Sequence, residues 1–209
     1  MANSVGSVED IVNLALADIG WAQRLGSVYD GSMAAKLALN LYSETRDEVL
    51  YSQTWMFARR SASLGAASKT APTGGYTVTP WSASYPAQPW MFEYAFPSDA
   101  IRILEVQPNN LPIPNYDPLP NAFEVVNENS TPPSTRVILS NVASAVAFYT
   151  GQVTNMSAWT QDFINMVVQR LGQRFLVSLK SGQALEALMK QQDQNVSSQS
   201  QTAMTNMES

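Results

Sequence analysis

Acidic side chains are the groups in this sequence that could carry out acid–base chemistry, and several occur in pairs. Glu9 lies next to Asp10, and Asp47 lies next to Glu48. Adjacent residues of a helix point in different directions, so these pairs are poor acid–base partners. Glu44 and Glu48 would share a helix face, and glycosidases do use two carboxylates across a cleft. A solvated helix face explains the same spacing more simply.

Other kinds of chemistry are excluded by composition, because the sequence has no cysteine and no histidine. Cysteine nucleophiles, disulfides, Cys/His zinc sites and Ser-His-Asp triads are therefore ruled out. The sequence also lacks a phosphate-binding glycine loop, a dinucleotide fingerprint and a cluster of metal ligands. We therefore predict no catalytic residues, no metal site and no cofactor, and we expect that the protein is not an enzyme.

The balance of charges points to protein partners rather than to nucleic acid. Only 14% of the 209 residues are charged, against about 25% in an average protein. This low charge is typical of a surface that faces other protein, although a surface rich in Ser, Thr, Asn and Gln would explain it equally well. The net charge is −5 and no long basic run occurs, so we expect no sequence-specific nucleic-acid binding. No apolar run is long enough to span a bilayer, so we expect no membrane partner.

Both ends of the chain carry apolar residues at helical spacing. A first helix is predicted from Ser7, because Ser7 and Asp10 have the spacing of a capping box. A second helix is expected over about 30–54, a third from about 157 to 181, and a fourth from about 183. These segments predict an antiparallel bundle of about four helices drawn from both chain ends.

Two large aromatic residues, Trp55 and Phe57, follow the second predicted helix. Large aromatics at a helix end usually fill a core, because each buries much apolar surface. We therefore expect Trp55 and Phe57 to form the core at the junction between a helical layer and a β-rich layer.

The middle of the chain has the signals of strands and loops. Alternating apolar residues, bounded by proline and turn residues, predict strands over about 91–96, 101–106, 123–127, 136–139 and 145–149. We therefore predict an α+β protein in which a small antiparallel β-sheet or sandwich domain is inserted into the helical bundle. The expected domains are residues 1–64 with 152–194 for the bundle, 65–151 for the β-rich insertion with its long loops, and 195–209 for a flexible tail.

One loop of the β-rich domain, residues 65–90, is long and aromatic, and Lys69 is its only charged residue. A loop of this kind either folds onto its own domain or presses against a partner. We take Tyr76, Trp81 and Tyr85 as its candidate partner contacts.

The tail, residues 195–209, is nearly uncharged and rich in Ser, Gln, Thr and Asn. Such a segment cannot bury enough apolar surface to order itself. It is either a frayed end or an arm that orders on a partner, with Val196, Met204 and Met207 as candidate anchors.

In their order along the chain, these parts resemble the head-to-tail adaptor proteins of short-tailed bacteriophages, the tail tubular protein A family. The resemblance extends roughly over residues 8–191. It is carried by IVNLALADIG, RDEVLYSQTWMFARRSASL, FEYAFPSDAIRILEV, FEVVNE, TRVILS and VAFYTGQVTNMSAWTQDF. The loops over 65–90 and 107–122 match no fixed motif of the family.

The resemblance implies a structural protein of the virion that is made in the host cytoplasm and placed at the head–tail junction. Its subunits would form a dodecameric ring between the portal protein and the tail nozzle protein. DNA would pass through the lumen of the ring without sequence-specific binding. The portal would be the partner of Val196, Met204 and Met207, and the nozzle or a neighbouring subunit the partner of Tyr76, Trp81 and Tyr85.

Two other functions remain open at this stage. The protein could be a stopper or tail-completion protein of a long-tailed phage, a different structural role. It could also be a cell-wall hydrolase that uses carboxylates such as Glu44 and Glu48.

Overall fold

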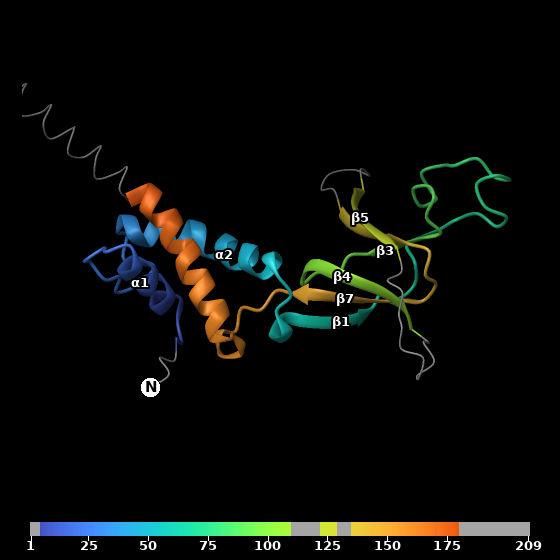
Figure 1. Ribbon diagram of the computed structural model, residues 1–209. Helices are drawn as coiled ribbons and strands as arrows, with labels where there is room; N and C mark the ends of the chain where they lie inside the picture. The colour runs from blue at the N-terminus through green and yellow to red at the C-terminus, as the bar shows by residue number, and fades with distance from the viewer. Residues whose placement is uncertain (1–4, 110–121, 129–134, 180–209) are drawn as a thin grey trace, which may run out of the picture. The chain divides into compact units, whose positions relative to one another are not determined.

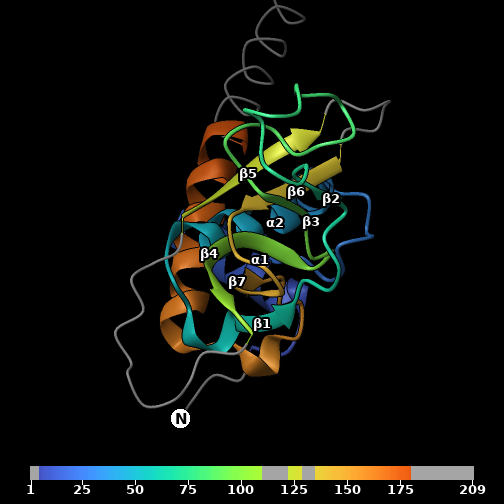
Figure 2. The same cartoon turned by 90° about the vertical axis from the view of Figure 1, so that its right-hand side faces the viewer.

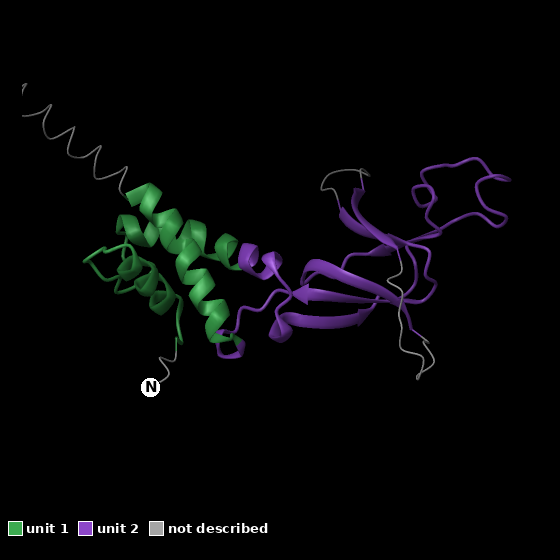
Figure 3. Cartoon of the chain, viewed as in Figure 1, with its two compact units in different colours: residues 1–46, 159–209 green, residues 47–158 purple. Residues whose placement is uncertain are grey.

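The computed structural model describes residues 5–109, 122–128 and 135–179. It divides into two compact units (Figure 1, Figure 3), and each unit is described separately below. The first unit combines residues 1–46 with 159–209 and is helical in its described part. The second unit, residues 47–158, holds all the strands found among the described residues.

Three helices account for the described part of the first unit. They are α1 (Val8–Asp18), α2 (Met33–Ser52), whose last residues belong to the second unit, and an unlabelled helix over residues 161–179. The capping box predicted at the start of α1 is confirmed. The Ser7 hydroxyl accepts a hydrogen bond from the Asp10 backbone N–H, and the Asp10 carboxylate accepts one from the Ser7 backbone N–H. Two backbone donors that a helix start leaves open are thus satisfied.

The core of this unit lies between the helix over 161–179 and its neighbours. The helix buries a stripe of side chains spaced four residues apart: Phe163, Val167, Leu171, Phe175 and Leu179. Gly172 lies beside this stripe, where a Cβ atom would come within 3.3 Å of the Ala15 carbonyl oxygen. The missing side chain therefore lets this helix approach the backbone of α1 closely.

Seven strands form two antiparallel sheets in the second unit (Figure 1, Figure 2). The three-stranded sheet has the order β1 (Arg59–Ser63), β7 (Ala145–Gly151) and β4 (Ala100–Pro108). The four-stranded sheet has the order β2 (Lys69–Thr70), β3 (Phe92–Ala95), β6 (Thr135–Ser140) and β5 (Phe123–Glu128). Two single-turn 3₁₀ helices, η1 (Met56–Ala58) and η2 (Met156–Ala158), flank these strands in the sequence.

Both sheets contribute side chains to one core. Tyr94 and Ile138 come from the four-stranded sheet, and Val106, Ala147 and Tyr149 come from the three-stranded sheet. The Tyr94 hydroxyl donates a hydrogen bond of 2.7 Å to the Val142 carbonyl oxygen, so this buried polar group is satisfied. The core therefore lies on one face of the four-stranded sheet, which we call its inner face.

The predicted bundle of about four helices is wrong as a description of the fold. The described residues contain three α-helices and seven strands in two antiparallel sheets, which is a mixed α+β fold with substantial sheet content. The fourth helix, expected from residue 183, lies outside the described residues, as does the tail over 195–209.

Two strands were also absent from the prediction. β1 consists of polar and small residues that are mostly exposed, so its sequence has no apolar alternation. Its pairing with β7 defines it as a strand. β2 has only two residues and is defined by pairing with β3.

Candidate interaction surface

The longest loop of the described chain, residues 71–91, joins β2 to β3 (Figure 1). Backbone hydrogen bonds of its own hold it in a series of tight turns. The N–H of Gly75 bonds to the Pro72 carbonyl at 2.9 Å, and the N–H of Trp90 bonds to the Ala87 carbonyl at 3.0 Å. The loop therefore has internal structure that can position its side chains.

The three predicted contact residues of this loop gather around one buried carbonyl group. The Tyr76 hydroxyl and the Trp81 indole N–H both donate to the Pro86 carbonyl oxygen, at 2.7 and 2.9 Å. The Tyr85 ring packs edge-on against Tyr76, with 6.3 Å between the ring centroids. Tyr76 and Tyr85 are half-buried, whereas Trp81 is 52% exposed. Tyr76 and Tyr85 thus brace the loop, and Trp81 remains open to a ligand or partner.

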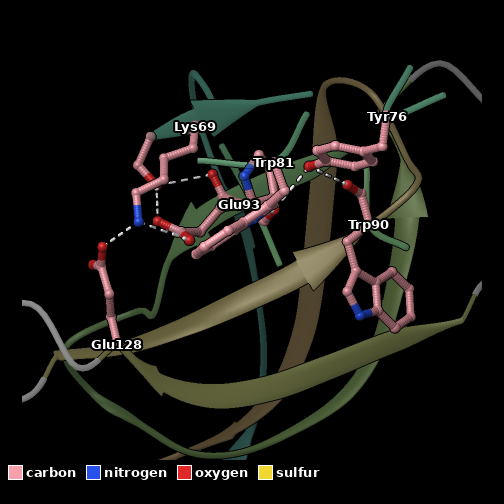
Figure 4. A network of polar contacts seen from close by, with 8 residues as sticks. Lys69, Tyr76, Trp81, Trp90, Glu93 and Glu128 are labelled. Atoms are coloured by element: carbon pink, nitrogen blue, oxygen red, sulfur yellow. Dashed lines mark hydrogen bonds and ion pairs between the residues drawn. The ribbon is translucent and has the colours of Figure 1, made fainter. Parts of the chain in front are cut away.

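The four-stranded sheet also has an outer face, opposite the core. This outer face carries a network of charges (Figure 4). Lys69 on β2 stands opposite Glu93 on β3, and the Lys69 Nζ atom lies 3.3 Å from Glu93 Oε2. Lys69 also pairs with the carboxylate of Glu128 on β5. Glu93 is only 4% exposed, and its Oε1 atom accepts a hydrogen bond of 3.1 Å from the Ser68 hydroxyl. The buried carboxylate is therefore both paired with a cation and hydrogen-bonded.

The protonation of Lys69 reflects its two partners. Burial alone would lower the pKa of the Lys69 ammonium, because it disfavours the charged form. Hydrogen bonds to Glu128 and Glu93 outweigh this effect and raise the pKa above its ordinary value. Lys69 is therefore charged at neutral pH. Sequence reasoning noted Lys69 as the single charge of its segment, but it did not connect Lys69 with Glu93 or Glu128.

A cavity of about 380 Å³ lies between this outer face and the loop. We call it the loop pocket. It is lined by Lys69, Glu93, Glu128, Leu139, Trp81 and Tyr85, among others. A concave site with aromatic and apolar walls and a few polar groups is the usual form of a small-molecule site.

The aromatic pair predicted as core, Trp55 and Phe57, belongs to the second unit. Trp55 is 7% exposed, and its indole N–H donates to the Val49 carbonyl oxygen at 2.8 Å. Phe57 is half-buried, with its ring centroid 6.0 Å from that of Trp55. Trp55 thus ties the segment after α2 to the last turns of that helix.

The remaining predicted residues fall into two groups. Val196, Met204 and Met207 lie outside the described residues, so their role stays a prediction. Glu44 is largely exposed and lies 3.3 Å from an Arg174 guanidinium nitrogen. An exposed ion pair of this kind is typical of a solvated helix face.

In the part of the chain that the structure describes, no group of three or more acidic side chains is placed to hold a metal ion. Among the described helices, none combines the length and the apolar character needed to cross a bilayer.

No protein-family model matches the chain, and no curated protein matches it at a significant level.

Proposed function

We propose that this protein is a structural adaptor of a bacteriophage virion, which forms a ring between the portal and the tail nozzle and lines the channel for DNA. The proposed partners come from the resemblance to the tail tubular protein A family. The described residues add support from their exposed apolar side chains and their charge.

The observation that carries the proposal is the number of large apolar side chains exposed on both units. Tyr29 and Val177 in the first unit are 81% and 73% exposed, and Met56 and Val78 in the second unit are 76% and 72% exposed. Single exposed apolar residues are common in proteins. Here they accompany a charged fraction of only 14%, so little charge opposes close contact with other protein. A ring requires two different contact surfaces on each subunit, and such side chains suit that need.

The net charge of −5 supports the proposed role as the lining of a DNA channel. Proteins that hold DNA neutralise its phosphates with Lys and Arg. A chain with an excess of acidic groups repels phosphates instead, so a channel wall built from it would let DNA slide past.

The proposal can be tested by light scattering on the purified protein, alone and with portal rings from the same phage. We expect a single subunit in solution and a ring of twelve copies on each portal. A template makes weak contacts sufficient, because the portal holds neighbours at high effective concentration. A stable dimer that ignores the portal would contradict the proposal.

A matched pair of variants assigns the contact to the loop. Val78→Ser removes an exposed apolar side chain from loop 71–91, and we expect it to weaken ring formation without changing thermal stability. Thr77→Ala truncates the neighbouring exposed polar residue and should leave ring formation unchanged. Undiminished ring formation by Val78→Ser would show that this side chain is not part of the contact.

A further inference from the structure

We propose that the loop pocket binds a neutral saccharide, with Trp81 as the surface on which a sugar ring packs. This inference goes beyond the structural role proposed above and does not depend on it. It rests on the size of the cavity, on the availability of the Trp81 ring, and on the pairing of the charges that line the pocket.

The cavity has the dimensions of a ligand site. Its volume of about 380 Å³ lies within the roughly 300–1,000 Å³ that small-molecule pockets occupy. Its lining includes three apolar residues of the four-stranded sheet, Val126, Val137 and Leu139. The pocket thus combines apolar side chains with the polar groups of Lys69, Glu93 and Glu128.

The polar edge of the Trp81 indole is already engaged within the loop. The indole N–H already donates to Pro86, so it adds no hydrogen bond to a ligand in the pocket. Half of the side chain is nevertheless exposed, and Figure 4 shows it lying beside the Lys69–Glu93 pair. One face of a sugar ring carries C–H groups and is apolar, so it can pack on an aromatic face while its hydroxyls stay in reach of polar groups.

The charges of the pocket argue against a charged ligand. A cation would meet the Lys69 ammonium, and an anion would meet the carboxylates of Glu93 and Glu128. Either one would have to break an ion pair that includes a buried carboxylate, which is costly. The one ammonium and two carboxylates sum to a net charge of −1, which disfavours an anion, and a cation that used either carboxylate would have to compete with Lys69 for it. The pocket therefore favours a neutral ligand.

Hydroxyl groups match the polar groups that remain. A hydroxyl both donates and accepts, so neighbouring hydroxyls can donate to carboxylate oxygens and accept from an ammonium. Among the described residues, Glu93 and Glu128 occupy two of the three donors of the Lys69 ammonium. A sugar can therefore bond to this ion set without breaking it. A neutral aromatic ligand such as a nucleoside would also stack on Trp81, and the experiment below separates the two.

The test is titration of the full-length protein with named probes, followed by ligand-observed NMR. The saccharide probes are maltose, lactose, cellobiose and N,N′-diacetylchitobiose; spermidine represents cations, and adenosine represents neutral aromatic ligands. We expect at least one of the saccharides to bind, and neither spermidine nor adenosine. Binding of adenosine or spermidine with none of the four saccharides, or no binding at all, would overturn the inference.

Three variants tie the binding to the pocket. Trp81→Ala should weaken saccharide binding about tenfold, or about 1.4 kcal/mol, through the loss of packing on the aromatic ring. Glu128→Gln keeps the size of the side chain but alters the acceptors, and should weaken binding by a smaller factor. Val78→Ala changes an exposed residue of the same loop that does not line the pocket, and should leave the affinity unchanged. A saccharide affinity that survives both Trp81→Ala and Glu128→Gln would place the ligand elsewhere and overturn the inference.

Discussion

The two faces of the four-stranded sheet differ in what they bury, and two adjacent residues of β3 show the difference. Glu93 points to the outer face and is 4% exposed, whereas Tyr94 points to the inner face and is 1% exposed. Tyr94 packs among apolar side chains of both sheets. Glu93 needs the ammonium of Lys69 and the hydroxyl of Ser68 to be tolerated. The inner face therefore stabilises the fold, and the outer face holds paired polar groups that a ligand can use.

The largest effect is expected on the inner face. Tyr94→Ala should lower the free energy of unfolding by about 3–5 kcal/mol, as truncation of large core aromatics does. Tyr94→Phe is the control, because it loses only the hydrogen bond to Val142 and should cost about 1 kcal/mol. Urea unfolding measures both values. If Tyr94→Ala cost no more than Trp81→Ala on the outer side, the contrast between the faces would be wrong.

Removal of the cation from the outer face should have the next largest effect. Lys69→Met leaves the Glu93 carboxylate buried without its ammonium, and we expect a loss of about 2–3 kcal/mol. The expected loss lies at or below the lower end of the range for breaking a fully buried ion pair, because the Lys69 side chain keeps some contact with solvent. The double variant Lys69→Met, Glu93→Gln should recover much of the loss in the same unfolding assay. No recovery would mean that Lys69 contributes through packing rather than through charge.

The pH dependence of the same variant gives a sharper test. The folded protein raises the pKa of Lys69 above its ordinary value of about 10.5, so its contribution is complete below that pH and is lost as the pH rises through the folded pKa. Ionisation of tyrosines affects the wild type and Lys69→Met alike. We therefore expect the difference in melting temperature between the two proteins to shrink above about pH 10.5. A constant difference up to the alkaline limit of folding would contradict the ion-pair explanation.

The smallest effect is expected at the rim of the pocket. Glu128→Gln should cost no more than about 1 kcal/mol, because Glu128 is partly exposed and Lys69 keeps its bond to Glu93. Thermal melting of Glu128→Gln and of Lys69→Met compares the two losses of stability. A loss as large as that of Lys69→Met would make Glu128, rather than Glu93, the principal partner of the lysine.

Local sequence signals located several elements correctly. The spacing of Ser7 and Asp10 identified the start of α1, because a capping box involves residues three positions apart. Alternation of apolar residues located the segments that form β3, β4, β5, β6 and β7. Apolar residues at helical spacing also predicted the helix over 161–179, which lies within the expected range of about 157–181.

Structural features that depend on residues distant in the sequence could not be predicted from such local signals. Lys69 meets Glu93 and Glu128 only because β2, β3 and β5 belong to one sheet, and no local pattern encodes their register. The close approach of Gly172 to Ala15 likewise involves another helix, so no local pattern of the sequence encodes it. The four-helix bundle was wrong because the described residues contain three helices and two antiparallel sheets. Of the seven strands, β1 and β2 carry no apolar alternation that could have indicated them.

The most direct test of the proposed function is cryo-electron microscopy of virions that contain this protein. The adaptor proposal predicts a short-tailed particle in which a twelvefold ring of this protein lies between the portal and the tail nozzle. The wall of its channel should be neutral or acidic, in keeping with the net charge of −5. Density for the protein elsewhere in the particle, a long-tailed particle, or a channel wall lined mainly by Arg and Lys would contradict the proposal.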